Sequence, residues 1–238
     1  LDTLQDRGEI PIMYISGDGT GVPMRKEELA GRRGKQPDGS AKTREVKLGC
    51  VFVQTEVDKE GHPIRKEEST SYIGSFAEAA EFGLLLRQEA RRRGLGRAVK
   101  LVFIGDGAAW VWELARVNFP GAVLILDFYH ALQHVHGLVD AVWGKETPAG
   151  KKVLTRWKKW LLKDQASHIL RQAKAPLASA LDTENARKEI GYFENNLARL
   201  PYGTFRKAGY FIGSGVSAAG SKTVVGKRMK CSGMFWSE

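Results

Sequence analysis

The stretch VKLVFIGDGAAWVWELARVNFPGAVLILDFYH, residues 99–130, decides the fold of this chain. It begins with a short continuous apolar run, VKLVFI, which is typical of a strand covered on both faces. AAWVWELARVNF then predicts a helix, and AVLILDFYH predicts a second buried strand. Two buried strands with a helix between them indicate an α/β sheet.

Three more strands are expected upstream. IPIMYIS, residues 10–16, is apolar and ends at Gly-Asp-Gly, which we interpret as a turn. REVKLGCVFVQTEV alternates like a strand and SYIGSF predicts a short third one, so the three favour an antiparallel meander. The amphipathic residues 76–93 predict a helix that ends in three arginines, where cations suit the helix dipole. The expected order is βββαβαβ.

The pattern changes after His130. Residues 131–199 carry no strand signal, and KKVLTRWKKWLLK predicts a basic amphipathic helix within them. The break LPYG separates this segment from a last helix that follows Gly-Ser-Gly. We therefore expect a core in residues 1–130, an all-helical insertion in residues 131–199, and a completion of the core in residues 200–238.

Composition limits the class of protein. The chain has 238 residues, 42% of them hydrophobic, which excludes a disordered tail. Lys and Arg outnumber Asp and Glu by 37 to 27, and the net charge of +10 favours polyanionic partners without excluding an ordinary enzyme. Cys50 and Cys231 are far apart, so we expect no disulfide framework and a reducing cytosol. No apolar run approaches the roughly 20 residues of a membrane span, and no signal-peptide pattern is present.

Each of three expected strands is followed by an aspartate. They are Asp18 in ISGDGTG, Asp106 in FIGDGAAW and Asp127 in LILDFYH. Active sites of such sheets collect at the strand ends, where side chains leave the core. The alternative is that each aspartate is a turn residue or a helix N-cap. Two Gly-Asp-Gly elements after apolar strands in one chain favour the functional interpretation.

Carboxylates on neighbouring strands repel each other unless a cation lies between them. Mg²⁺ prefers such oxygen ligands, and two ions about 4 Å apart can activate the attacking oxygen and stabilise the leaving one in phosphodiester chemistry. That arrangement needs one acid more than Asp18 and Asp106 provide.

The segment DFYHALQHVH allows another hypothesis, a zinc site. Asp127, His130, His134 and His136 are candidate ligands, and a helix would place His130 and His134 on one face. The segment lacks the Glu of H-E-x-x-H and has no cysteine pair. Histidines that contact phosphate or lie beside the strand end are the favoured interpretation.

Three longer motifs carry a resemblance. YISGDGTGVPM, VFIGDGAAWVWELARVNFPGAVLILDFYHALQHV and YFIGSGVSAAGSKTVVGKRMKCSGMFWS are similar to bacterial insertion-sequence transposases of the Kra type, relatives of the Mutator-like transposases. The resemblance implies a ribonuclease H-like core, a mixed sheet flanked by helices with a helical insertion before the last core helix. It places the first two catalytic acids on Asp18 and Asp106, and an Asp-x-x-His element beside the site on Asp127 and His130.

The third acid departs from the family pattern. The resemblance implies a Glu in the first turn of the last helix, in a stretch like Gly-Ser-Gly-Val-Val-Glu-Ala-Gly-Cys-Lys. Here Ala218 stands at the Glu position and Ser221 at the Cys position. Residues 214–230 contain no acid that could replace it. We expect Ser214 to cap this helix.

Two basic clusters are candidate DNA contacts. Lys158, Lys159 and Lys163 belong to a group of cations interleaved with tryptophans in the insertion, and the alternative is a solvated helix face. The second cluster lies on the last helix, which would border the metal site. It comprises Lys222, Lys227, Arg228 and Lys230.

The resemblance implies a DDE-type transposase that cleaves and joins DNA strands with two Mg²⁺ or Mn²⁺ ions. Its partners would be double-stranded DNA, as transposon ends and target, and further copies of the chain, in a bacterial cytoplasm at the nucleoid and not at a membrane. With Ala218 in place of the Glu, we expect this chain to be inactive. The alternatives are a non-catalytic DNA-binding module and a metal-dependent nuclease unrelated to transposition. The family's segment for recognising DNA ends is not in this sequence, so specific recognition of terminal repeats is not expected from it alone.

Overall fold

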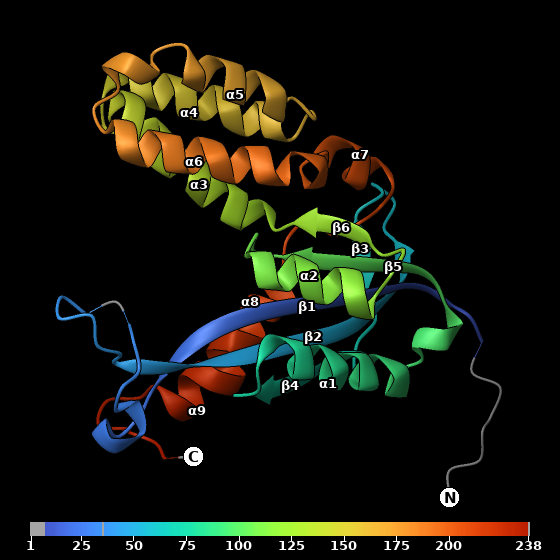
Figure 1. Ribbon diagram of the computed structural model, residues 1–238. Helices are drawn as coiled ribbons and strands as arrows, with labels where there is room; N and C mark the ends of the chain where they lie inside the picture. The colour runs from blue at the N-terminus through green and yellow to red at the C-terminus, as the bar shows by residue number, and fades with distance from the viewer. Residues whose placement is uncertain (1–7, 35, 238) are drawn as a thin grey trace, which may run out of the picture.

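The computed structural model describes residues 8–34 and 36–237, so the ends of the expected division, residues 1–7 and 238, lie outside the described residues. Six strands form one mixed sheet (Figure 1). Their bounds are β1 Ile10–Pro23, β2 Thr43–Val57, β3 Pro63–Arg65, β4 Ser71–Ser75, β5 Ala98–Gly105 and β6 Val123–Leu126.

The sheet has the strand order β3-β2-β1-β5-β6, and β4 also pairs with β2. β1 runs antiparallel to β2, whereas β5 and β6 run parallel to β1. β3 and β4 pair with successive parts of β2, so they share one edge of the sheet. The expected antiparallel meander is confirmed, with the addition of β3, a three-residue strand that the sequence pattern missed. Its first residue is Pro63, which a strand tolerates at this position.

The expectation that Gly-Asp-Gly ends the first strand is wrong. β1 continues through Asp18 to Pro23 and stays paired with β2 along this whole length. Gly19 and Gly21 face side chains of β2, whereas Gly17 has only an ordinary contact with Phe103. A Cβ on Gly19 would lie 2.4 Å from Oε1 of Glu45, and one on Gly21 would lie 2.5 Å from Oγ1 of Thr43. Asp18 therefore lies within a strand, with its side chain held by the sheet.

Helices cover both faces of the sheet (Figure 1). α1 and α2 pack against each other and on one face, while α8 packs on β1 and β2 from the other face. No helix in residues 8–34 and 36–237 is long and apolar enough to cross a membrane. The α-helices are α1 Ala79–Arg92, α2 Ala109–Asn118, α3 Phe128–Trp143, α4 Pro148–Leu161, α5 Ala166–Lys174, α6 Thr183–Asn196, α7 Tyr202–Lys207, α8 Gly215–Gly220 and α9 Lys227–Met229. Short 3₁₀ turns span Lys26–Leu29, Leu95–Arg97, Leu177–Ser179 and Leu197–Arg199.

The second buried strand is shorter than expected. β6 ends at Leu126, and α3 already begins at Phe128, so the DFYH residues belong to the strand–helix junction instead of the strand. From there to residue 199 the described chain contains helices and their connections without a strand. Because α3 continues without a break into this helical segment, the division at residues 130 and 199 remains a proposal.

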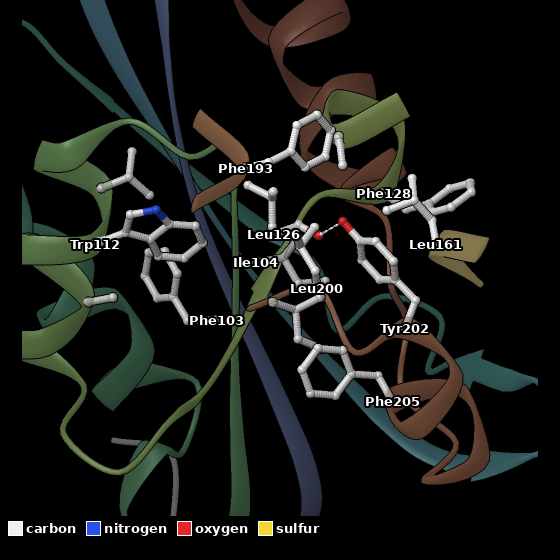
Figure 2. Close-up of a cluster of buried hydrophobic side chains, with 14 of the residues drawn as sticks. Phe103, Ile104, Trp112, Leu126, Phe128, Leu161, Phe193, Leu200, Tyr202 and Phe205 are labelled. Atoms are coloured by element: carbon white, nitrogen blue, oxygen red, sulfur yellow. Dashed lines mark hydrogen bonds between the residues drawn. The ribbon is translucent and has the colours of Figure 1, made fainter. Parts of the chain in front are cut away.

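One hydrophobic core joins the sheet to the helical segment. Phe103 and Leu126 from the parallel strands and Phe193 from α6 belong to the same buried cluster, as do residues of α7 (Figure 2). The hydroxyl of the fully buried Tyr202 donates a hydrogen bond of 2.9 Å to the carbonyl oxygen of Leu126, at the very end of β6. This shared core fixes the helical segment against the carboxyl ends of β5 and β6.

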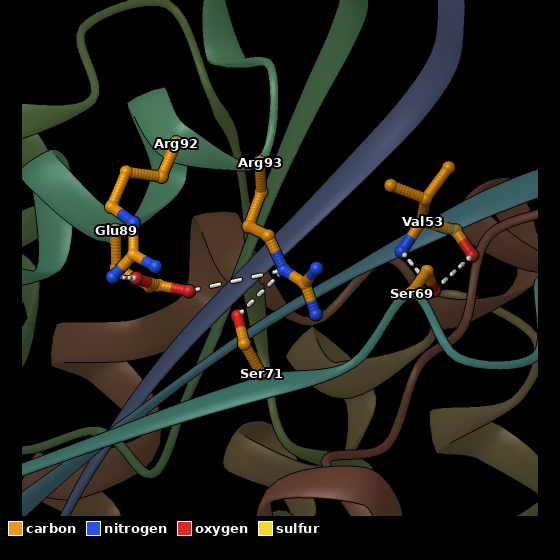
Figure 3. Close-up of polar contacts among 6 residues, drawn as sticks. All are labelled: Val53, Ser69, Ser71, Glu89, Arg92 and Arg93. Carbon is orange, nitrogen blue, oxygen red and sulfur yellow. Dashed lines mark hydrogen bonds and ion pairs between the residues drawn. The ribbon is translucent and has the colours of Figure 1, made fainter. Parts of the chain in front are cut away.

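The arginines at the end of α1 also have a packing role. Nε of Arg93 donates a 3.0 Å hydrogen bond to the hydroxyl of Ser71 at the start of β4 (Figure 3). Glu89, one turn back on α1, pairs with Arg93 at 3.8 Å and with Arg92 at 3.2 Å. The helix end is therefore tied to the edge of the sheet, in addition to any favourable interaction of these cations with the helix dipole.

Candidate active site

Three carboxylates follow one line across the sheet. The pairing places Gly17 of β1 opposite Gly105 of β5, and Gly105 opposite Leu126 of β6. In each case the next residue in the chain is an aspartate. Since neighbouring strands lie about 4.8 Å apart, Asp18, Asp106 and Asp127 form a row at this end of the sheet.

A cavity of about 270 Å³ opens at this row. Its walls come from β1, from the ends of β5 and β6, from the start of α3 and from α8. The lining residues include Ser16, Asp18, Asp106, Asp127, Tyr129, His130, Gln133, Ser214, Ser217 and Ala218.

Asp18 is a partly buried acid with a perturbed pKa. Its Oδ2 accepts a 2.9 Å hydrogen bond from the hydroxyl of Ser221. Burial raises the pKa of Asp18 above its ordinary value, and the negative charge of Asp106 raises it further, although Ser221 and His130 oppose the shift. Ionising Asp18 is costly because it is partly buried and lies beside a second acid. A bound cation would lower that cost by balancing the negative charges.

Asp106 lies in a true turn. Its Oδ1 accepts a 2.9 Å hydrogen bond from the N–H of Ala108, and its carbonyl oxygen accepts one of 2.7 Å from the hydroxyl of Tyr192. Gly107 has a φ of +100°, and Tyr192 would contact any Cβ there, so only glycine fits this position. The turn uses only one of the two carboxylate oxygens of Asp106, so the turn does not exclude the functional interpretation, which stays a prediction.

Asp127 has a structural role at this edge. It is only 5% exposed, and both of its oxygens accept hydrogen bonds from backbone amides. Oδ1 accepts from the N–H of His130 at 2.7 Å, which caps α3, and Oδ2 accepts from the N–H of Ser214 ahead of α8. Asp127 thus connects the strand end to the last helix.

The last helix approaches Asp18 with small and hydroxyl side chains. α8 runs into a π-helical turn, Ser221–Gly226, and then into α9, so residues 215–229 form one helical rod. Ala218, the position at which the resemblance implies the third acid, lines the cavity. The expected cap by the Ser214 side chain is wrong, because this side chain makes no capping hydrogen bond. The N–H of Ser214 binds Asp127 instead.

The residues fit a divalent ion in part. Asp18 and Asp106 supply carboxylates of the kind that Mg²⁺ and Mn²⁺ prefer. The hydroxyl of Ser217 also lines the cavity, is buried, and has no hydrogen-bond partner among the described residues. A buried oxygen without a partner beside two acids is consistent with a missing ligand at this place. Among the described residues, Asp127 does not join Asp18 and Asp106 in one cluster of ligand atoms.

The zinc hypothesis is not supported. In the part of the chain that the structure describes, the ligand atoms of Asp127, His130, His134 and His136 form no cluster. Nδ1 of His134 pairs with Oε2 of Glu189 at 2.5 Å, and its ring stacks on Tyr192 at 3.5 Å. This histidine is therefore part of the packing between α3 and α6.

A different group has the spacing of metal ligands. Asp58, Glu60 and His62 lie in the β2–β3 turn with ligand atoms within 4.8 Å of one another. They are mostly exposed, and Asp58 already accepts hydrogen bonds from the amides of the other two. Leu48 pairs with Asp18, so this turn lies at the other end of β2, roughly 30 Å from the row of acids. It is not part of the candidate active site.

The basic residues of the last helix lie beside this site. Lys222, Lys227 and Arg228 are exposed. Nζ of Lys230 donates a hydrogen bond to the hydroxyl of Thr20, two residues beyond Asp18 on the same strand face. Lys158, Lys159 and Lys163, by contrast, belong to α4 and the turn that follows it, within the helical segment.

We predict that Asp18→Asn stabilises the protein at neutral pH. The raised pKa means that the folded state disfavours the ionised carboxylate, so Asp18 lowers stability as the pH rises above the ordinary aspartate value of 3.8. The melting temperature of the variant should exceed that of the parent at pH 7, and the two should converge in acid below pH 3.8, where the carboxylate is neutral in both states. Mn²⁺ should raise the melting temperature of the parent alone. A variant that melts lower than the parent at pH 7 would contradict this assignment.

The strand order and directions define the class of fold. Four strands joined by antiparallel pairing, β1 to β4, are followed by β5 and β6, which run parallel to β1, and with helices on both faces they form the mixed sheet of a ribonuclease H-like α/β fold. The predicted fold class is confirmed.

Comparison with known proteins adds little beyond the fold. No protein-family model and no curated protein sequence matches the chain. A solved structure described as "Drosophila P element transposase strand transfer complex" resembles it with a TM-score of 0.32 and 11% sequence identity. The similarity covers 87% of this chain and 48% of that one, so the chain spans about half the length of its structural neighbour. Similarity of this size does not indicate a shared activity.

Proposed function

We propose that this chain is the catalytic domain of a DDE-type DNA transposase, of the Kra insertion-sequence type, and that Ala218 leaves it without its third acid. One observation carries the proposal, the row of Asp18 and Asp106 on adjacent strands at a cavity whose far wall is the last helix. Ala218 of that helix lines the same cavity.

The chemistry follows from what these side chains can hold. When two divalent ions are bound at such a site, they activate the attacking oxygen and stabilise the leaving oxygen of a phosphodiester. Asp18 and Asp106 would hold the ions, Mg²⁺ or Mn²⁺, from the sheet side. Ser221 keeps Asp18 oriented through its hydroxyl, and Asp127 holds α8 against the strand ends. Without a carboxylate at position 218, we expect weak ion binding and almost no turnover.

Double-stranded DNA, as transposon ends and target, is the proposed partner. Lys230 contacts Thr20, two residues beyond Asp18, and Lys222 follows Ser221, which binds Asp18, so phosphates of a bound strand would pass these two cations. Lys222 follows position 218 by one helical turn, so it can approach the phosphate beside the reacting one. Assembly into a homo-oligomer on DNA is part of the same proposal.

Ion binding tests this function without requiring turnover. We predict that Mn²⁺, followed by its electron paramagnetic resonance signal, binds weakly to the chain, and that Asp18→Asn or Asp106→Asn abolishes this binding. Asp58→Asn is the matched control, because it removes a carboxylate from the exposed cluster in the β2–β3 turn. If Asp58→Asn abolishes the binding and the other two variants do not, the row of acids is not a metal site and the proposal fails.

Ala218 itself favours a second candidate function. A domain that keeps the fold and the basic surfaces but lacks a catalytic carboxylate can serve as a DNA-binding module. The two candidates predict different results when a carboxylate is placed at position 218.

A further inference from the structure

Beyond the candidate active site, the helical segment carries a second cavity, of about 510 Å³, along α4. Together, α4 and α5 form the part of this segment that lies farthest from the sheet (Figure 1). The cavity is lined by Lys152, Thr155, Arg156, Lys159, Trp160, Lys163 and Gln165. We call this surface the α4 groove.

The packing of α4 determines which cations reach the groove. Val153, Trp157 and Leu161 form its buried face, and Nε1 of Trp157 donates a 2.8 Å hydrogen bond to Gln172 of α5. With that face fixed, Lys152, Arg156, Lys159 and Lys163 follow one another at spacings of four, three and four residues and form one stripe beside it. Lys151 and Lys158 lie roughly 120° away around the helix axis.

The groove has no negative charge of its own. No acidic residue belongs to its lining, and within the described parts of the chain no acid pairs with Lys152, Lys159 or Lys163. Asp164, the nearest acid in sequence, accepts hydrogen bonds from the N–H groups of Gly203 and Thr204 at 2.6 and 2.9 Å and so faces α7. Elsewhere on these helices, Lys151 pairs with Glu146 and Lys174 with Glu194.

Arg156 is an unsatisfied donor in the middle of the stripe. Its guanidinium lies over the ring of Trp160, 5.3 Å from the centroid, which restricts its orientation. Its Nε is buried and has no hydrogen-bond partner among the described residues. Because this Nε is buried, contact with a ligand in the groove falls to the terminal nitrogens of the guanidinium, a group that binds phosphate oxygens well.

We propose that the α4 groove binds the phosphate backbone of double-stranded DNA, at a place separate from the candidate active site. The stripe from Lys152 to Lys163 is roughly 16 Å long, the rise of about five base pairs. Its lysines and arginine contact phosphates, so the binding is independent of base sequence. The choice of DNA as the polyanion rests on the proposed function.

Two double variants on the same helix test the groove. Lys159→Ala with Lys163→Ala removes two groove cations, and Lys151→Ala with Lys158→Ala removes two cations from another side of α4. Both pairs change the net charge equally and alter exposed side chains, so both proteins should keep the melting temperature of the parent. Binding of a fluorescent duplex that lacks element ends is measured between roughly 50 and 200 mM salt.

We predict that the groove variant binds the duplex more weakly and that the slope of log K against log salt becomes shallower by about 1.8, two phosphate contacts at 0.9 each. The control variant should retain the parent's slope. Equal losses of DNA affinity in both variants would mean that diffuse positive charge binds the DNA. A groove variant that binds the duplex as tightly as the parent would show that the groove does not bind DNA. Either result overturns the inference, as does a parent chain that does not bind the duplex.

Mn²⁺ binding separates this inference from the proposed function. The groove variant should bind Mn²⁺ like the parent, because its changes are on α4 and not at Asp18 or Asp106. A groove effect on DNA in a chain that binds no Mn²⁺ would support the groove and contradict the proposed function. Normal Mn²⁺ binding, with DNA binding by the groove variant equal to that of the parent, would support the proposed function and contradict the groove.

Discussion

Ala218→Glu should raise divalent-dependent DNA nicking by at least about 100-fold over the chain as it stands. Position 218 lines the cavity that holds Asp18 and Asp106, so a carboxylate there can complete a site for a second ion. Two factors of ten correspond to about 2.7 kcal/mol of transition-state stabilisation, a modest value for a lost metal ligand. The measurement is nicking of DNA that carries the element's ends, with Mg²⁺ or Mn²⁺, and with any flanking protein segments that binding requires.

Ala219→Glu is the matched control for this prediction. It adds the same charge one residue later, at an exposed position that does not line the cavity. We expect it to behave like the parent, and we expect Asp106→Asn to abolish the activity gained by Ala218→Glu. Equal nicking by the parent and Ala218→Glu would show that position 218 does not supply the ligand. A folded Ala218→Glu variant that binds DNA but never nicks it would favour the DNA-binding module.

Asp127→Ala should lower the free energy of unfolding by roughly 3 kcal/mol or more. Two backbone N–H groups, of His130 and Ser214, each lose a hydrogen bond to a buried carboxylate, and such bonds contribute about 1.5 to 3 kcal/mol each. For a chain of this size, that corresponds to a fall of roughly 6 to 12 °C in melting temperature. Asp127→Asn should destabilise the protein less than Asp127→Ala does. Its amide oxygen can still accept a hydrogen bond and cap α3, but its amide nitrogen is a donor and cannot accept one from the other N–H group.

Asp182→Ala is the control for the structural role of Asp127. Asp182 is exposed, and its side chain caps α6 through one hydrogen bond of 3.0 Å from the N–H of Asn185, with no second side-chain hydrogen bond among the described residues. Its loss should cost about 1 kcal/mol, the ordinary value for an N-cap. Amide hydrogen exchange at Ser214 should accelerate in Asp127→Ala and stay unchanged in Asp182→Ala. Equal destabilisation by the two variants would show that Asp127 is only a helix cap.

Much of the sheet could be predicted from local sequence pattern. β5 and the helix after it follow from a continuous apolar run and a run of helical period, which depend only on neighbours in the chain. The position of Asp106 directly after an apolar strand could be predicted in the same way. The expectation that Gly-Asp-Gly ends the first strand is wrong, because β1 stays paired with β2, more than twenty residues away in sequence, through Asp18 to Pro23. No local pattern reports that pairing.

The site itself depended more on long-range contacts. The sequence predicted that Asp127 lies beside the site, but it did not predict the hydrogen bond from the N–H of Ser214. Ser214 is 87 residues further along the chain. The single signal for this was the aspartate directly before a helix, and that signal describes a cap and nothing further. The basic cluster of α4 was visible in the sequence, but its division into groove and non-groove lysines was not. The buried face of Val153, Trp157 and Leu161 makes that division.

By itself, the sequence determined the order of the strands and helices up to residue 130 apart from β3, the aspartates at the ends of two parallel strands, and the alanine at position 218. These depend on hydrophobic period and residue identity, which the chain carries locally. Tertiary structure alone decided that Asp18 lies within a continuous strand, that Asp127 holds the last helix in place, and that Lys159 reaches a groove while Lys158 does not. The physical reason is that burial and hydrogen bonding arise between segments distant in sequence, and they determine which side chains remain free to bind a ligand.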